Sequence, residues 1–417
     1  MTQEKCEETI LTFHINKAKM NKVSTKRKYI TEDFTNSKQK RIKNVEEAEN
    51  NECAINNIIN LGIPHIGEKI FSSVDTNELI QLIEVSEPWK VIIENVLLRR
   101  WNGRIYEACK DGKTEIVKIL LANLKGKNPE LNAKDAHGLT AFTRACKNGH
   151  KDVVKLLLDH SGSKHVGKNA SYWACANGHK DVVKLLLQHS GSKNIDMNAT
   201  DNVRRTPFMI ACKNGHTDVV KLMLVHADSK NIDLNTGDNF GHTPFMKACS
   251  NGHIDVIKIL LDHSDSKTID MNAYNENGRT GFISACISGH QDVVELLLQN
   301  SAIKNIDLNA TTERGQTAFL RACGNGHTDV IKLLLYYSDR CNIDLNAKSD
   351  RGWTGFMEAC RNGYKDVFKI LLDHSGSQPI DYTAKNNYGQ TANALASKYG
   401  HTNVVKLLRK YSKNKDC

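Results

Sequence analysis

Residues Gly278–Leu298 read G-R-T-G-F-I-S-A-C-I-S-G-H-Q-D-V-V-E-L-L-L, and this stretch decides the fold. Thr280 suits the N-cap of a short helix, in which apolar residues from Phe282 onward recur at helical spacing. Gly289 suits the left-handed residue that ends such a helix. Residues Val293–Leu298 then place an apolar stripe on a second helix. The stretch therefore predicts a helix–loop–helix unit.

The same sequence motif recurs along the chain. Its glycine stands at Gly112, Gly149, Gly178, Gly215, Gly252, Gly289, Gly326, Gly363 and Gly400. Successive glycines are 37 residues apart, except that Gly178 follows Gly149 after only 29. Because one such unit cannot bury its apolar face alone, the repetition predicts an all-α array of about nine stacked units over residues 102–411. The short interval predicts a gap in the row of turns near Lys168.

The pattern T-P-F-x-x-A-C-x-N-G-H-x-D-V-V-K-L-L-L, plainest at Thr206–Leu224 and Thr243–Leu261, resembles the ankyrin repeat. The resemblance implies a solenoid of helix pairs with projecting β-turn fingers. The period of 37 residues is longer than the family's usual length of about 33, and we expect the extra residues in the loop after the second helix. The family's histidine after T-P-L is absent, so we expect apolar packing in place of its hydrogen bonds. The replacing residues are Thr143, Met209, Met246, Ile283, Leu320 and Met357.

Residues 55–101 carry apolar residues at helical spacing and resemble an F-box. The resemblance implies helices that bind the Skp adaptor subunit of a cullin ubiquitin ligase. The residues expected to dock or shape those helices are Pro64, Ile66, Ile70, Leu79, Val85 and Trp89. Glu87 and Pro88 depart from the family, since a basic pair is common before its tryptophan. The competing interpretation is a helical cap that covers the apolar face of the first repeat, as any solenoid needs.

The two ends of the chain are polar. Residues 1–54 are charged and predict a disordered tail, and residues 412–417 form a short basic tail. Lys26-Arg27 and Lys38–Arg41 resemble a bipartite nuclear import signal, although such runs can also be a solvated tail. No signal peptide and no apolar run of the ~18 residues that a membrane span needs are present, so we expect an intracellular protein, cytoplasmic or nuclear.

Cysteines and histidines follow the repeat and predict packing roles instead of chemistry. Eight cysteines stand three residues before the repeat glycine, and seven histidines follow it directly. No Cys-x-x-Cys or His spacing suits a metal, and no P-loop, dinucleotide-binding, zinc-protease or kinase motif occurs. We therefore expect soft core cysteines, histidines near helix C-termini, no cofactor, no metal and no enzyme activity.

A binding face is expected on the first helix of each unit. The positions five and two residues before the glycine share one side of that helix, and basic residues predominate there. In ankyrin proteins that side and the fingers are where partners usually bind. The candidate contact residues are Arg144, Lys147, Trp173, Lys213, Lys247, Arg321, Trp353, Glu358 and Arg361.

Three interpretations of that face are open. An acidic protein segment matches its net positive sign, a solvated basic face with no partner is the alternative, and nucleic acid is less favoured because no recognised nucleic-acid module is present. With the F-box resemblance, the sequence predicts a substrate receptor of a Skp–cullin–F-box ubiquitin ligase. The alternative is an ankyrin scaffold or inhibitor without a ligase, in which residues 55–101 are only a cap.

Overall fold

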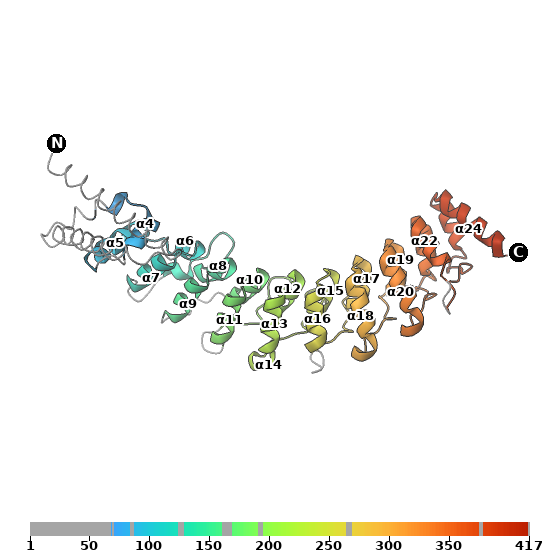
Figure 1. Cartoon of the computed structure of the whole chain (residues 1–417), viewed down its shortest axis with the longest axis horizontal. Helices are drawn as coiled ribbons and strands as arrows, with labels where there is room; N and C mark the ends of the chain where they lie inside the picture. The colour runs from blue at the N-terminus through green and yellow to red at the C-terminus, as the bar shows by residue number, and fades with distance from the viewer. Residues whose placement is uncertain are drawn as a thin grey trace, which may run out of the picture. The chain divides into compact units, whose positions relative to one another are not determined.

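The structure, a computed structural model, describes residues 68, 71–83, 87–123, 129–160, 169–190, 195–263, 269–374 and 378–415 (Figure 1). The predicted tail of residues 1–54 lies outside them, as do four expected adaptor-binding residues and the expected gap in the turns. Those positions are Pro64, Ile66, Ile70, Val85 and Lys168. The described residues form helices and turns, with one isolated bridge between Lys385 and Thr391 and no strand. The chain divides into two compact units, residues 1–133 and 134–417.

The second unit repeats a pair of antiparallel helices. Its first helices lie side by side, and its second helices lie side by side next to them (Figure 1). The first helices are α8 (Ala141–Asn148), α10 (Ala170–Ala176), α12 (Pro207–Asn214), α15 (Pro244–Ser250), α17 (Gly281–Ser288), α19 (Ala318–Asn325), α21 (Gly355–Asn362) and α23 (Ala392–Lys398). The second helices are α9 (Lys151–Asp159), α11 (Lys180–His189), α13 (Thr217–Val225), α16 (Ile254–His263), α18 (Gln291–Lys304), α20 (Thr328–Cys341), α22 (Lys365–Leu372) and α24 (Thr402–Lys415). The short α14 (Ala227–Lys230) follows α13.

The ends of the first helices are set by the residues that the sequence singled out. The hydroxyl of Thr280 accepts a hydrogen bond from the backbone of Ile283, 3.3 Å away, and so caps α17. Gly289 ends the helix in the left-handed conformation, with φ at 76°. The residues that lengthen the repeat continue the second helix in α18 and α20, and each of these two helices then stops at a left-handed asparagine, Asn305 or Asn342. Part of the expected loop is therefore helix.

The core of the second unit runs between the two rows of helices. One phenylalanine per repeat is almost fully buried from α12 to α21, and the periodic cysteine stands one turn later, also buried. These phenylalanines are Phe208, Phe245, Phe282, Phe319 and Phe356. The six residues that replace the family's histidine are all buried as well, so packing occupies that position as expected. Burial of the cysteines fits the expected soft core role.

An asparagine ladder joins successive repeats beside the second helices. The Asn272 side chain donates to the backbone oxygen of Asn305 at 2.8 Å and accepts from the backbone nitrogen of Asp307 at 2.9 Å. Asn198, Asn309 and Asn346 repeat the arrangement. Because each bond spans two repeats, the ladder fixes the spacing between neighbours. This accounts for the recurrent N-x-I-D-x-N text.

The fingers form a second ladder on the side of the first helices. In most described fingers the side chain of the first residue accepts backbone N–H groups two and four residues later, as Asp238 does from Phe240 and His242 at 3.0 Å. In one finger the hydroxyl of Ser349 accepts only from Trp353, four residues later. Neighbouring fingers are joined through their backbones. The amide of Glu313, for example, donates to the oxygen of Asn277 at 3.0 Å. The fingers between residues 201 and 390 therefore form a continuous edge.

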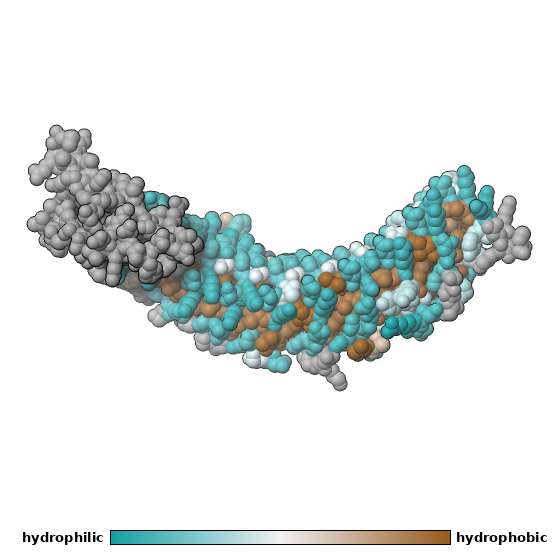
Figure 2. Space-filling view, in the orientation of Figure 1, coloured by the Kyte–Doolittle hydropathy of each residue, from teal (hydrophilic) through white to brown (hydrophobic). Residues whose placement is uncertain are grey.

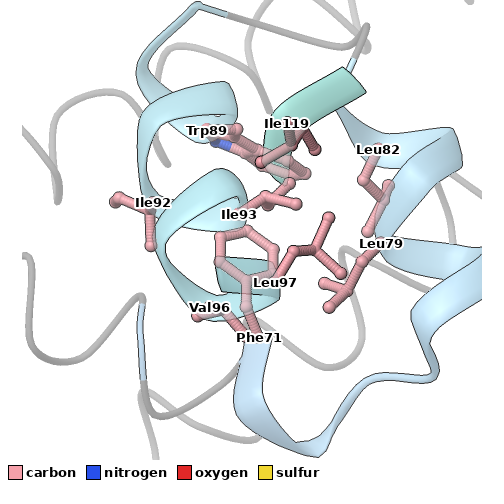
Figure 3. Packing of buried hydrophobic residues seen from close by; sticks show 9 residues of the cluster. All are labelled: Phe71, Leu79, Leu82, Trp89, Ile92, Ile93, Val96, Leu97 and Ile119. Atoms are coloured by element: carbon pink, nitrogen blue, oxygen red, sulfur yellow. The ribbon is translucent and has the colours of Figure 1, made fainter. Parts of the chain in front are cut away.

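The first unit contains α4 (Thr76–Leu82), α5 (Glu87–Arg100), α6 (Ile105–Lys110), α7 (Thr114–Asn123) and the 3-10 helix η1 (Pro129–Asn132). Figure 3 shows Leu79 of α4 and Trp89 of α5 pointing into one apolar cluster with Phe71 and Ile93. Ile119 of α7 belongs to the same cluster. The helices before residue 101 therefore share a core with the first repeat's second helix.

Candidate protein-binding face

The candidate contact residues all lie on the first helices or on the fingers that lead into them. Arg144 and Lys147 stand on α8, Trp173 on α10, Lys213 on α12, Lys247 on α15, Arg321 on α19, and Glu358 and Arg361 on α21, while Trp353 precedes α21. We call this set, together with the fingers, the first-helix face. Each of these side chains is partly exposed. Figure 2 shows mostly polar residues along the edge of the second unit where the first helices lie.

Two of the cations are neutralised by the finger of their own repeat. Arg144 forms an ion pair with Asp135, nine residues earlier, and both side chains are largely buried. Lys247 lies 2.9 Å from Asp238, again nine residues earlier, and the Nδ1 atom of His242 lies 3.1 Å from the same carboxylate. Burial raises the pKa of Asp238, but hydrogen bonds from Lys247 and from backbone amides outweigh it and lower the pKa to about 2. These cations brace the fingers and carry little net charge toward a partner.

A third finger holds its own cation in a different way. Arg205 donates two hydrogen bonds to Asp201, at 2.8 and 2.6 Å, from within the finger, while Ile210 occupies the position of Arg144 and Lys247. Asp135, Asp201 and Asp238 are not among the residues predicted from the sequence. Their signal was available, because a finger aspartate stands nine residues before Arg144 and before Lys247 in the printed repeats.

Aromatic rings hold two further candidate cations. The Nζ atom of Lys147 lies 4.1 Å from the ring centroid of Trp173. The guanidinium of Arg361 lies 5.2 Å from the centroid of Trp353 and 3.4 Å from Glu358. Such stacking fixes a cation in place at little loss of side-chain entropy on binding. The structure thus brings four of the predicted residues into two preformed pairs.

Two of the candidate cations on the first helices make neither an ion pair nor an aromatic contact within the described residues. The side chains of Lys213 and Arg321 make no ion pair or hydrogen bond within the described residues. The Nε atom of Arg321 is buried with no hydrogen-bond acceptor in that part of the chain. Burial and the charge of neighbouring Arg279 lower the pKa of Arg321. These two positions offer uncompensated positive charge to a partner.

Exposed aromatic rings stand on the fingers beside the cations. Phe240 and Tyr388 on the fingers are 56% and 66% exposed, and Tyr274 is 75% exposed. Sequence reasoning missed Tyr274 because its position holds threonine, glycine or lysine in other repeats. Aromatic residues beside arginine are enriched in the energetically important parts of protein interfaces.

The two described adaptor candidates, Leu79 and Trp89, are buried in the cluster of the first unit. Their side chains can shape the surface of α4 and α5 but cannot contact a partner directly. An apolar residue of α5 that does face outward is Val91, which is 60% exposed. No helix in the described part of the chain combines the length and apolar character that crossing a membrane demands.

Comparison with known proteins supports the ankyrin resemblance. The family model for ankyrin repeats in sets of three matches residues 105–201, 193–270, 264–348 and 339–417. The ankyrin repeat domain of Bcl-3, a member of the IkappaB protein family, is a similar solved structure with 23% identity and a TM-score of 0.47; the match covers 57% of this chain and 97% of that one. No curated protein sequence matches. The ankyrin repeats that cover residues 105–417 indicate a protein–protein interaction module, and the chain belongs to the ankyrin repeat family.

Proposed function

We propose that the chain is a binding module whose first-helix face holds an acidic segment of a partner protein. The observation that carries this proposal is the pair of uncompensated cations on that face, Lys213 and Arg321, whose side chains make no described ion pair. A partner carboxylate would supply the missing counter-charge. Positive charge also speeds the encounter with an acidic partner and sets its register.

The rest of the face suits the same partner. Arg144 and Lys247 already form ion pairs with finger carboxylates. They therefore fix the position of the fingers, and a partner carboxylate is left to Lys213 and Arg321. The stacked pairs Lys147–Trp173 and Arg361–Trp353 present apolar surface next to charge. Aromatic and arginine side chains of this kind dominate the binding energy of protein interfaces, while surrounding contacts exclude water.

A labelled polyglutamate peptide tests the proposal by fluorescence anisotropy on the full chain. Lys213→Gln and Arg321→Gln should each weaken binding, and the double variant more so. The matched control is Lys221→Gln, because Lys221 is an exposed lysine on second helix α13, away from the first-helix face. Equal weakening by all three substitutions would indicate a non-specific charge effect and reject the face as the site.

Nucleic acid would give a different result in the same assay. A labelled single-stranded DNA oligonucleotide should bind more weakly than polyglutamate if the partner is an acidic protein segment. Tighter DNA binding, with affinity falling steeply as salt rises and insensitive to sequence, would replace the proposal with a nucleic-acid function.

The ubiquitin ligase role is a second proposal, which rests on the F-box resemblance. It is supported by α4 and α5, which form a helical unit with a buried core of their own residues. The participation of Ile119 in that core equally favours the cap interpretation. Val91→Glu separates the two, because Val91 is exposed on α5 and outside the core. Co-purification with a Skp adaptor that is lost in a folded Val91→Glu chain would support the ligase role, whereas no capture by the unaltered chain would leave the helices as a cap.

A further inference from the structure

Three arginines gather where the fingers before α17 and α19 meet. Arg279 closes the first of these fingers, Arg314 stands at the tip of the next, and Arg321 lies on α19. The two fingers are adjacent, since the amide of Glu313 donates to the backbone oxygen of Asn277 at 3.0 Å. The side chains of Arg279 and Arg314 make no hydrogen bond or ion pair among the described residues, and both repel the charge of Arg321.

This site differs from those of Arg144 and Lys247 in one substitution. Arg321 stands nine residues after Thr312, just as Arg144 follows Asp135 and Lys247 follows Asp238. The hydroxyl of Thr312 makes the finger's turn, accepting from the amides of Arg314 at 3.3 Å and Gln316 at 3.2 Å. It replaces the structural function of the aspartate without supplying its charge. Arg321 therefore lacks the counter-ion that its equivalents possess.

Nearby carboxylates do not fill that place. Glu358 attracts Arg321, but its Oε2 atom already lies 3.4 Å from the Nη1 atom of Arg361. Glu276 and Glu313, on the same two fingers, form no ion pair within the described residues. The buried Nε atom of Arg321 is left as a donor without an acceptor, which is unfavourable unless a ligand provides one.

We propose that Arg279, Arg314 and Arg321 form a binding site for the phosphoryl group of a phosphorylated residue in a partner protein. The inference rests on the proposed function, because it adds a specific modification to the acidic segment on the first-helix face. A phosphoryl group carries about −1.5 to −2 charges at pH 7 and three acceptor oxygens. It can therefore accept hydrogen bonds from several guanidinium groups at once and offset their charge. One carboxylate would neutralise only one arginine. Arginine also matches phosphate in a two-pronged geometry that lysine cannot offer.

The test compares three labelled peptide pools of random sequence that share flanking glutamates and differ only at a central residue, which is phosphoserine, glutamate or serine. Binding to the full chain is followed by fluorescence anisotropy. The phosphoserine pool should bind about tenfold more tightly than the glutamate pool, the difference expected for additional charge-assisted hydrogen bonds. Arg321→Gln should abolish that preference, whereas Lys213→Gln should weaken all acidic pools and leave the preference intact.

A second variant shows whether the phosphoserine preference can be removed in a chain that remains folded. Thr312→Asp supplies the aspartate present in the fingers of Arg144 and Lys247, so it should neutralise Arg321, raise the melting temperature and remove the phosphoserine preference. A stable Thr312→Asp chain that keeps the preference would overturn the inference. Equal binding of the phosphoserine and glutamate pools by the unaltered chain would also overturn it, while leaving the acidic-segment proposal standing. Failure of every acidic pool to bind would reject both, and preferential capture of a DNA oligonucleotide would assign the arginines to a nucleic-acid phosphate.

Discussion

The Nε2 atom of His253 donates a hydrogen bond to the backbone oxygen of Lys213, 2.7 Å away and in the preceding repeat. Lys213 lies in the last turn of α12, where helix carbonyls have no partner within the helix. The same bond recurs in the pairs His179–Lys147, His216–Ala176, His290–Ser250, His327–Ile287 and His401–Arg361. A histidine ladder therefore satisfies the ends of the first helices from the next repeat.

Removing one rung of this ladder should destabilise the second unit. His253→Ala leaves the Lys213 carbonyl without its donor, so we expect the free energy of unfolding to fall by about 1–3 kcal/mol. Urea unfolding followed by circular dichroism measures the change. His137→Ala is the control, because His137 is an exposed finger residue. An unchanged midpoint for His253→Ala would show that water replaces the histidine without loss.

The histidine ladder also leaves no room for a side chain at most of the repeat glycines. Gly252 has φ at 75°, and a Cβ atom there would lie 2.7 Å from the Nδ1 atom of His290. Gly400 has φ at 79° but nothing within 4 Å of such an atom. Gly400→Ala should therefore show only the backbone penalty of about 1–2 kcal/mol, and Gly252→Ala should exceed it. Equal losses in thermal unfolding would mean that the histidine ring moves aside freely.

Much of the fold was predictable from short stretches of sequence, because the residues that start and end each helix lie within one repeat. Thr280 as N-cap, Gly289 as C-cap and the apolar stripes of both helices all act over a few residues. The partner of His253 could not be found in this way. Its bond spans 40 residues, and the sequence indicates only that a histidine near a helix C-terminus is favourable.

The candidate face was predictable in position but not in charge. The spacing predicts Arg144, Lys247 and Arg321 on one side of the first helices, and these residues lie on α8, α15 and α19. From the sequence all three are candidate cations for a partner, yet Arg144 and Lys247 are paired with finger aspartates. The difference depends on how each finger folds back toward its helix, which composition does not reveal.

Replacing Arg144 and Arg321, which stand at equivalent positions of their repeats, should change the stability of the fold differently. Arg144→Met breaks the largely buried ion pair with Asp135, so it should lower stability by about 1–3 kcal/mol. Arg321→Met removes a donor without an acceptor and a charge that Arg279 repels, so stability should stay equal or rise. Differential scanning calorimetry of the two variants measures both signs. A similar loss in both would show that Arg321 has a counter-ion in solution.

Acid should weaken the finger that contains Asp238. Its pKa of about 2 is below the ordinary value of 3.8, because hydrogen bonds from Lys247 and from backbone amides outweigh the opposing effect of burial. A carboxyl whose pKa is lower in the folded state stabilises the fold above pH 4, and that contribution is lost as pH falls from 4 toward 2. The full contribution is about 1–2 kcal/mol.

Asp238→Asn tests this assignment. The variant should be less stable than the unaltered chain at pH 7, and the difference should shrink as pH falls from 4 toward 2. Urea unfolding at a series of pH values measures it. A difference that stays constant over that range would mean that the carboxylate charge contributes nothing and that only the hydrogen-bonding shape matters.

The periodic cysteines should not react with alkylating reagents in the folded chain. Burial raises the pKa of Cys109 and Cys360 to about 12 each, and it raises the pKa of Cys146, Cys175, Cys212, Cys249, Cys286 and Cys323 as well. Because only the thiolate reacts, iodoacetamide at pH 8 should leave all eight unmodified within the time needed to label Cys341, which is partly exposed.

Peptide mapping by mass spectrometry reads out each site separately, and labelling in urea supplies the control in which every thiol reacts. Protection should disappear together for all eight cysteines if the helix pairs unfold as one cooperative block. If it disappears first at Cys109 or Cys360, nearer the ends of the array, the repeats open from their termini, as expected where each repeat is stabilised only by its neighbours. Labelling of the central Cys249 in the native chain as fast as Cys341 would contradict the buried core described above.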